Sequence, residues 1–154
     1  MNVFLADEQD DPLDAEPLRR LVINALEREG LPDRVDVTVM FVGLDQITEY
    51  NERFMERNGP TDVLAFPVVQ LTPGRYPEPD PTDPPLSLGD VVIAPEYVRS
   101  QAADMGVRFE DELSLMVVHG LLHLLGYDHV TDEDAEVMEA RERQLLAQVG
   151  RKRR

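Results

Sequence analysis

The sequence predicts an α+β fold, a small mixed β-sheet enclosed by helices. The 154 residues are 42% hydrophobic and 30% charged, close to the average of globular domains, so enough apolar material is present for a sizeable core. Short apolar segments typical of strands occur among longer segments with helical periodicity, without the regular alternation of successive βαβ units. This length corresponds to one domain, and we expect residues 1–154 to form a single unit ending in a basic tail, residues 151–154.

Five segments have the periodicity and the boundary residues of helices. Their apolar residues recur every three or four positions, and capping or helix-ending residues lie at their ends. The predicted helices are residues 18–30, 44–55, 95–105, 109–125 and 131–150. We expect Asp45 to cap the second helix, and Thr131 with Asp134 to form a capping box at the start of the last. The fourth is apolar on all sides, which predicts that it is buried.

Three shorter segments are predicted to be strands. Residues 35–41 alternate apolar and polar side chains, as a strand with one buried face does. Residues 63–66 and 91–94 are short apolar runs, typical of strands covered on both faces, and a proline-rich surface loop, residues 73–85, lies between them. We assign no strand to the short apolar start, residues 3–6, and we expect the basic tail to be solvated.

The charge and the absence of cysteine exclude several classes of protein. Lys and Arg number 15 and Asp and Glu 31, a net charge of −16, so any contact with RNA requires a local basic patch, and we expect no DNA partner. Without cysteine, a metal ion must be held by histidine and carboxylate ligands. The longest uncharged stretch, residues 113–127, is too short to span a membrane, and no signal peptide is recognisable, so we expect a cytoplasmic protein without a membrane partner.

All three histidines lie between positions 119 and 129, at His119, His123 and His129. Histidines four residues apart share one helix face and can direct their imidazoles at one ion. Gly126 can adopt the left-handed conformation that ends a helix, which would turn the chain so that His129 reaches the same ion. Three imidazoles leave the fourth tetrahedral position open, which is typical of a catalytic zinc ion and favours hydrolysis by a zinc-bound water.

Other interpretations of the histidines stay open. They could be hydrogen-bonded core residues, or Asp128 could close the site around a purely structural ion. The spacing also matches the metzincin protease pattern except that Gly120 stands where the protease has its glutamate general base, which disfavours a peptidase. A glycine inside a helix indicates close packing or substrate access beside the metal, and the sequence does not separate the two.

The segment from His119 to His129, HGLLHLLGYDH, resembles the signature H-G-x-L-H-L-x-G-Y-D-H of the YbeY family of bacterial endoribonucleases. The similarity extends over residues 51–146. Its other parts are PTDVLAFP at residues 60–67, LGDVVI at residues 88–93, and Met138, Glu139 and Leu146 in the last predicted helix.

The resemblance implies a sheet enclosed by helices, one zinc ion on the three histidines, and action on single-stranded RNA in the 3′-end maturation of small-subunit ribosomal RNA and in ribosome quality control. Ribosomal RNA is the implied substrate, and ribosomal proteins or assembly factors are the implied partners. Many family members carry an arginine implicated in function after an aromatic residue, where this chain has Met55 after Phe54.

Three further residues are candidates for the site. Arg53 and Arg57 are four apart, could share a helix face and could contact phosphate. Asp128 could accept a hydrogen bond from a ligand histidine, or could simply shape a turn.

Two other functions stay open: a zinc-containing hydrolase of another substrate class, and a non-catalytic ribosome assembly factor in which zinc holds the fold.

Overall fold

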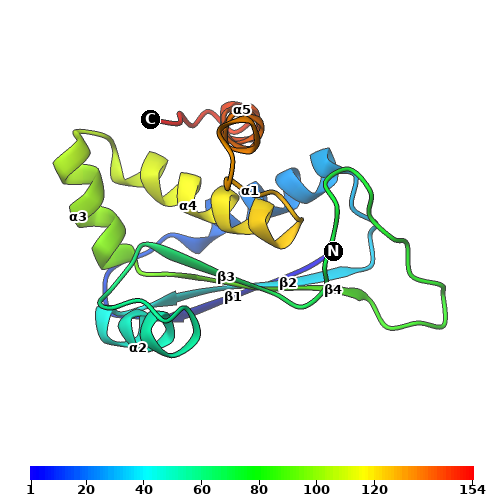
Figure 1. Cartoon of the computed structure of the whole chain (residues 1–154), viewed down its shortest axis with the longest axis horizontal. Helices are drawn as coiled ribbons and strands as arrows, with labels where there is room; N and C mark the ends of the chain where they lie inside the picture. The colour runs from blue at the N-terminus through cyan, green and yellow to red at the C-terminus, as the bar shows by residue number, and fades with distance from the viewer.

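The computed structural model describes residues 1–154, and its centre is a mixed four-stranded sheet (Figure 1). The strands are β1 (Asn2–Glu8), β2 (Val35–Val42), β3 (Val63–Pro67) and β4 (Leu86–Ile93). Their spatial order is β1-β2-β4-β3, with β1, β2 and β4 parallel and β3 antiparallel to β4. β3 therefore forms one edge of the sheet and β1 the other.

Helices cover both faces of this sheet (Figure 1), which confirms the predicted α+β class. They are α1 (Ala15–Glu29), α2 (Leu44–Phe54), α3 (Pro95–Met105), α4 (Phe109–Leu124) and α5 (Asp132–Ala147). In Figure 1, α1, α3 and α4 lie on one face and α2 on the other, while α5 lies over α4 as an outer layer. No helix combines the length and the apolar character that a bilayer crossing requires.

The main core lies between the sheet and α4. The alternating β2 side chains Val37, Val39 and Phe41 are all buried there, as their spacing predicts. α4 is buried on nearly all sides, because the sheet, α1, α3 and α5 surround it. A smaller cluster that includes Ile47 of α2 and Val92 of β4 fills the opposite face. α4 is thus the most enclosed helix, and it carries two of the three histidines.

The structure differs from the sequence-based prediction at several boundaries. Residues 2–8 form the edge strand β1, which makes β1-α1-β2 a parallel unit. The apolar part of this strand was too short, and its end too acidic, for the strand to be recognised from the sequence. α2 begins after Gly43, so Asp45 lies in its first turn and is not the cap. The cap of α5 is as predicted, since the Thr131 side chain accepts from the backbone N–H of Asp134 at 3.0 Å. The prediction that the tail is solvated was wrong, because three of its four side chains pair with acidic residues, as described below.

Candidate metal centre

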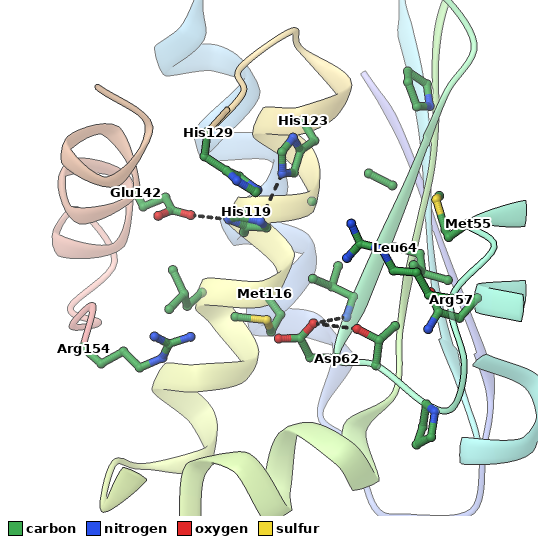
Figure 2. A pocket seen from close by; sticks show the side chains of 18 of the residues that line it. Met55, Arg57, Asp62, Leu64, Met116, His119, His123, His129, Glu142 and Arg154 are labelled. Carbon is green, nitrogen blue, oxygen red and sulfur yellow. Dashed lines mark hydrogen bonds and ion pairs between the residues drawn. The ribbon is translucent and has the colours of Figure 1, made fainter. Parts of the chain in front are cut away.

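The three histidines meet at the C-terminal end of α4 (Figure 2). His119 and His123 lie one turn apart, and their Nε2 atoms are 3.1 Å from each other. His129 comes from the loop before α5, and one ring nitrogen from each of the three lies within 4.8 Å of the others. The three imidazole rings therefore converge as the helical spacing and the turn after α4 predict.

The turn that returns His129 depends on Gly126. Its φ is 101°, a left-handed conformation that other residues rarely adopt. A Cβ atom at this position would lie 2.1 Å from the carbonyl oxygen of Leu71, in the loop that follows β3. Glycine is thus required both by the backbone conformation and by the close approach of a neighbouring segment.

Hydrogen bonds orient the two helical imidazoles. Nδ1 of His119 lies 2.8 Å from Oε2 of Glu142 on α5, and Nδ1 of His123 lies 3.1 Å from the carbonyl oxygen of Tyr127. Because both acceptors require an Nδ1–H donor, each Nε2 is left as a free lone pair facing the other histidines. This pairing of a ligand histidine with a carboxylate or a carbonyl is typical of metal sites.

The charge states of these groups suit ligation. Burial, reinforced by the neighbouring imidazoles, lowers the pKa of His123 and so favours its neutral form. Burial alone would raise the pKa of Glu142, but hydrogen bonds from His119 and Arg153 outweigh it and lower that pKa. The site therefore combines a His123 imidazole that favours its neutral form with a fixed carboxylate behind His119.

A buried carboxylate also fixes the loop that carries His129. Glu29, whose side chain is 3% exposed, accepts hydrogen bonds from the hydroxyl groups of Tyr76 at 2.7 Å and Tyr127 at 3.0 Å. It is also paired with Arg141 of α5. Burial, followed by the charge of Glu29, raises the pKa of Tyr127 to about 12, so this hydroxyl stays a donor at neutral pH. Three separate segments are thereby tied to the end of α1.

The three histidines lie in a groove of about 930 Å³ (Figure 2). One wall comes from α4, α5 and the tail, and the other from β3 and the segment that precedes it. The lining includes three arginines and two acidic residues, so the groove does not share the strongly negative charge of the whole chain. The charged residues are Arg57, Asp62, Glu142, Arg153 and Arg154.

The structure separates the other predicted site residues. Arg57 lines the groove, together with Met55, whereas Arg53 lies outside it, exposed on α2 and 5.4 Å from the ring of Phe54. The expectation that the two arginines share a helix face was wrong, because α2 ends at Phe54 and Arg57 follows it in a loop. The carboxylate of Asp128 accepts from the backbone N–H of His129 at 2.7 Å, an interaction that shapes the loop.

Gly120 packs against the sheet and also lines the groove beside the histidines. A Cβ atom there would lie 2.5 Å from Cγ1 of Val91 and 3.2 Å from Cγ2 of Val63. Close packing of α4 on β3 and β4 therefore accounts for the glycine. The glutamate of a metzincin has no space at this position.

Sequence reasoning missed Glu142 and the ion pairs that hold Arg153 and Arg154 of the tail. Oε1 of Glu142 accepts from Nε of Arg153 at 2.9 Å, while its other oxygen faces His119. A signal was present, because Glu142 lies on the apolar stripe of α5 formed by Met138, Leu145 and Leu146. A carboxylate at a core position requires a buried partner, and this one has two.

Fold and site together define a small α+β protein with a group of three histidines in a groove whose geometry is compatible with a metal ion. The family model described as Endoribonuclease YbeY matches residues 4–150. Endoribonuclease YbeY of Acidothermus cellulolyticus is 42% identical over 88% of this chain and 83% of its own length, and that of Parafrankia sp. is 39% identical over 96% and 93%. The solution structure of TM1509 from Thermotoga maritima is similar with a TM-score of 0.62 and 26% identity, over 95% of this chain and 90% of that one. The chain belongs to the YbeY endoribonuclease family.

Proposed function

We propose that the protein is a zinc-dependent endoribonuclease that cleaves single-stranded RNA in the 3′-end maturation of small-subunit ribosomal RNA and in ribosome quality control. The observation that carries this proposal is the convergence of three histidines in a groove of a YbeY-family chain. We place this activity in the cytoplasm, with ribosomal RNA as substrate and ribosomal proteins or assembly factors as partners.

The donor set fits zinc. His119, His123 and His129 would hold the ion through three neutral nitrogens, a set that suits zinc and leaves one tetrahedral position for substrate or water. When bound, zinc supplies Lewis acidity towards a phosphoryl oxygen and lowers the pKa of a water molecule. Glu142 keeps the proton of His119 on Nδ1, and the Tyr127 carbonyl does the same for His123, so both rings stay oriented.

The groove provides a place for the RNA backbone. Its volume lies in the range of clefts that hold drug-sized ligands, which suits a few unpaired nucleotides. Of the two arginines proposed from the sequence, Arg57 lines this groove and we assign the phosphate contact to it. Asp128 contributes by fixing the loop that presents His129.

The test combines metal content with RNA cleavage. Purified protein is expected to contain about one zinc ion per chain and to cleave single-stranded RNA in preference to duplex, peptide and ester substrates. A chelator should abolish cleavage, and added zinc should restore it. His123→Ala should lose the ion, because it leaves only two of the three imidazoles.

Two outcomes would contradict the proposal. Absence of any bound transition metal after incubation with zinc would reject the metal site. A tightly held ion without cleavage of any RNA would favour the non-catalytic assembly factor, and zinc-dependent cleavage of another substrate class would favour a different hydrolase.

A further inference from the structure

Arg154 of the tail is held at the groove by a buried anchor. Its Nε donates to both carboxylate oxygens of Glu112, at 2.9 and 3.0 Å. Glu112 lies on α4, is 1% exposed, and is itself fixed by Nε2 of Gln101 at 2.6 Å. An arginine bound in this way has a defined position at the wall of the groove, although it comes from a terminal segment.

The terminal nitrogens of Arg154 remain available for a ligand. Neither Nη1 nor Nη2 hydrogen-bonds to the protein, and the side chain is 34% exposed. Figure 2 shows the side chain extending from the tail towards Met116 on the groove side. A guanidinium anchored through Nε and free at both terminal nitrogens suits bidentate binding of a phosphate.

The preceding residue, Arg153, has a different role. Its Nε donates to Glu142 at 2.9 Å, its Nη1 donates to the carbonyl oxygen of Arg154 at 2.8 Å, and its Nη2 lies 3.5 Å from Glu139. All of its nitrogens are therefore engaged, and the side chain is only 14% exposed. Arg153 fixes the tail to α5, which leaves Arg154 as the arginine of this wall that can reach a ligand.

We propose that Arg154 binds a backbone phosphate of the RNA in the groove and so positions the strand relative to the three histidines. This inference rests on the proposed function and extends it to a substrate-binding residue. Figure 2 shows Arg57 and Arg154 on opposite sides of the groove, so the phosphate subsite of Arg154 is separate from that of Arg57.

The alternative is that Arg154 only neutralises the buried charge of Glu112. Two variants separate these roles: Arg154→Gln, which leaves Glu112 without its partner, and Glu112→Gln with Arg154→Gln, which removes the charge that needs neutralising. Lys152→Gln is the matched control, because Lys152 is exposed in the same tail, carries the same charge and does not line the groove.

The measurement is the affinity of the metal-loaded protein for a fluorescent single-stranded RNA, read by anisotropy at low temperature before cleavage, over a series of salt concentrations. Steady-state kcat and KM and thermal unfolding are recorded for each variant. We expect Arg154→Gln to weaken binding roughly tenfold and to reduce the salt slope by about 0.7, the value of one phosphate contact on a single strand. KM should rise by a similar factor with little change in kcat, and the double variant should remain as weak.

Recovery of wild-type affinity in the double variant would overturn the inference, because neutralisation would then be the whole role of Arg154. Equal affinities of Arg154→Gln and Lys152→Gln would overturn it as well. If Arg154→Gln fails to fold, the double variant and Arg154→Lys supply the comparison. Wild-type protein that neither binds nor cleaves RNA would instead reject the proposed function, and this inference with it.

Discussion

The histidines and the arginines of the groove are held in different ways. The backbone that carries the histidines is fixed by close packing: Gly120 touches the sheet and Gly126 touches the backbone of Leu71, so neither has room for a side chain. The arginines Arg57 and Arg154, on opposite sides of the groove, come from segments outside regular secondary structure, and Arg154 is held by an ion pair with Glu112. The position of the histidines therefore depends on backbone contacts, whereas the arginines are long side chains on irregular segments.

The largest expected effect is on the turn that positions His129, for Gly126→Ala. The methyl group would lie 2.1 Å from a backbone carbonyl oxygen, in addition to the cost of a left-handed backbone, so we expect a loss of at least about 3 kcal/mol in the free energy of unfolding. Bound zinc should fall with it. Denaturant unfolding and metal analysis measure both effects.

Gly74→Ala is the matched control for that variant. Gly74 also has a left-handed φ, 79°, but nothing lies within 4 Å of the position of its Cβ. It should cost only about 1 kcal/mol, the conformational penalty alone, and leave the zinc content unchanged. Equal losses in the two variants would show that contact with Leu71 does not hold the loop.

Gly120→Glu should destabilise the protein by about 2–3 kcal/mol without creating a peptidase. The substitution restores the metzincin pattern on paper, but its Cβ overlaps Val91, which overpacks the core. Unfolding and peptide cleavage with zinc present measure the two effects. Zinc-dependent peptide cleavage would show that this scaffold is closer to proteases than its packing indicates.

Glu142→Gln should lower zinc affinity by about tenfold while the fold is retained, because it weakens the hydrogen bond that orients His119. Competition with a fluorescent chelator measures the affinity. Glu136→Gln is the control, since Glu136 is exposed on the same helix. A similar loss in both variants would mean that net charge, and not the contact with His119, sets the affinity.

Arg57→Ala should raise KM for RNA roughly fivefold to tenfold and leave zinc content unchanged, since the charged hydrogen bond to phosphate that we propose for Arg57 would be lost. Arg53→Ala should have little effect, because Arg53 lies outside the groove. The double variant should then match Arg57→Ala. An effect of Arg53→Ala as large as that of Arg57→Ala would place the RNA path across α2.

The smallest expected effect concerns the pH dependence of stability. The unfolded chain loses the proton of Tyr127 near pH 10, whereas the folded chain keeps it to about pH 12. The free energy of unfolding should therefore fall as the pH rises through this interval, and Tyr127→Phe should make the fall shallower. Urea unfolding at several alkaline pH values tests this, and parallel curves would contradict it.

The convergence of the three histidines could be predicted from the sequence because they are close together along the chain. His119 and His123 are fixed by helical periodicity, and Gly126 indicates the turn that returns His129. The periodicity of α1 and β2 was equally informative, because one buried face dominates each of them, and α4 could be recognised as buried because it is apolar on all sides. The edge strand β1 was missed, since its pairing with β2 is a contact between segments more than 30 residues apart.

The contacts of Arg154 and Glu142 could be recognised only from the folded structure. Arg154 contacts a residue 42 positions earlier, and Glu142 contacts a histidine 23 positions earlier. No local periodicity indicates such pairs, although a glutamate on an apolar stripe shows that a partner exists. A terminal run of basic residues is usually solvated, whereas Asp111, Glu112 and Glu142 hold this one against the protein.

The position of the tail also determines where the protein can be labelled. Residues added after Arg154 would emerge beside the groove, where they would compete with the ion pairs of Arg153 and Arg154 and could cover the histidines. The N-terminus begins β1, at the opposite edge of the sheet from β3. A purification tag or a fluorophore belongs at that end, and activity lost with a C-terminal tag would report on the tag rather than on the enzyme.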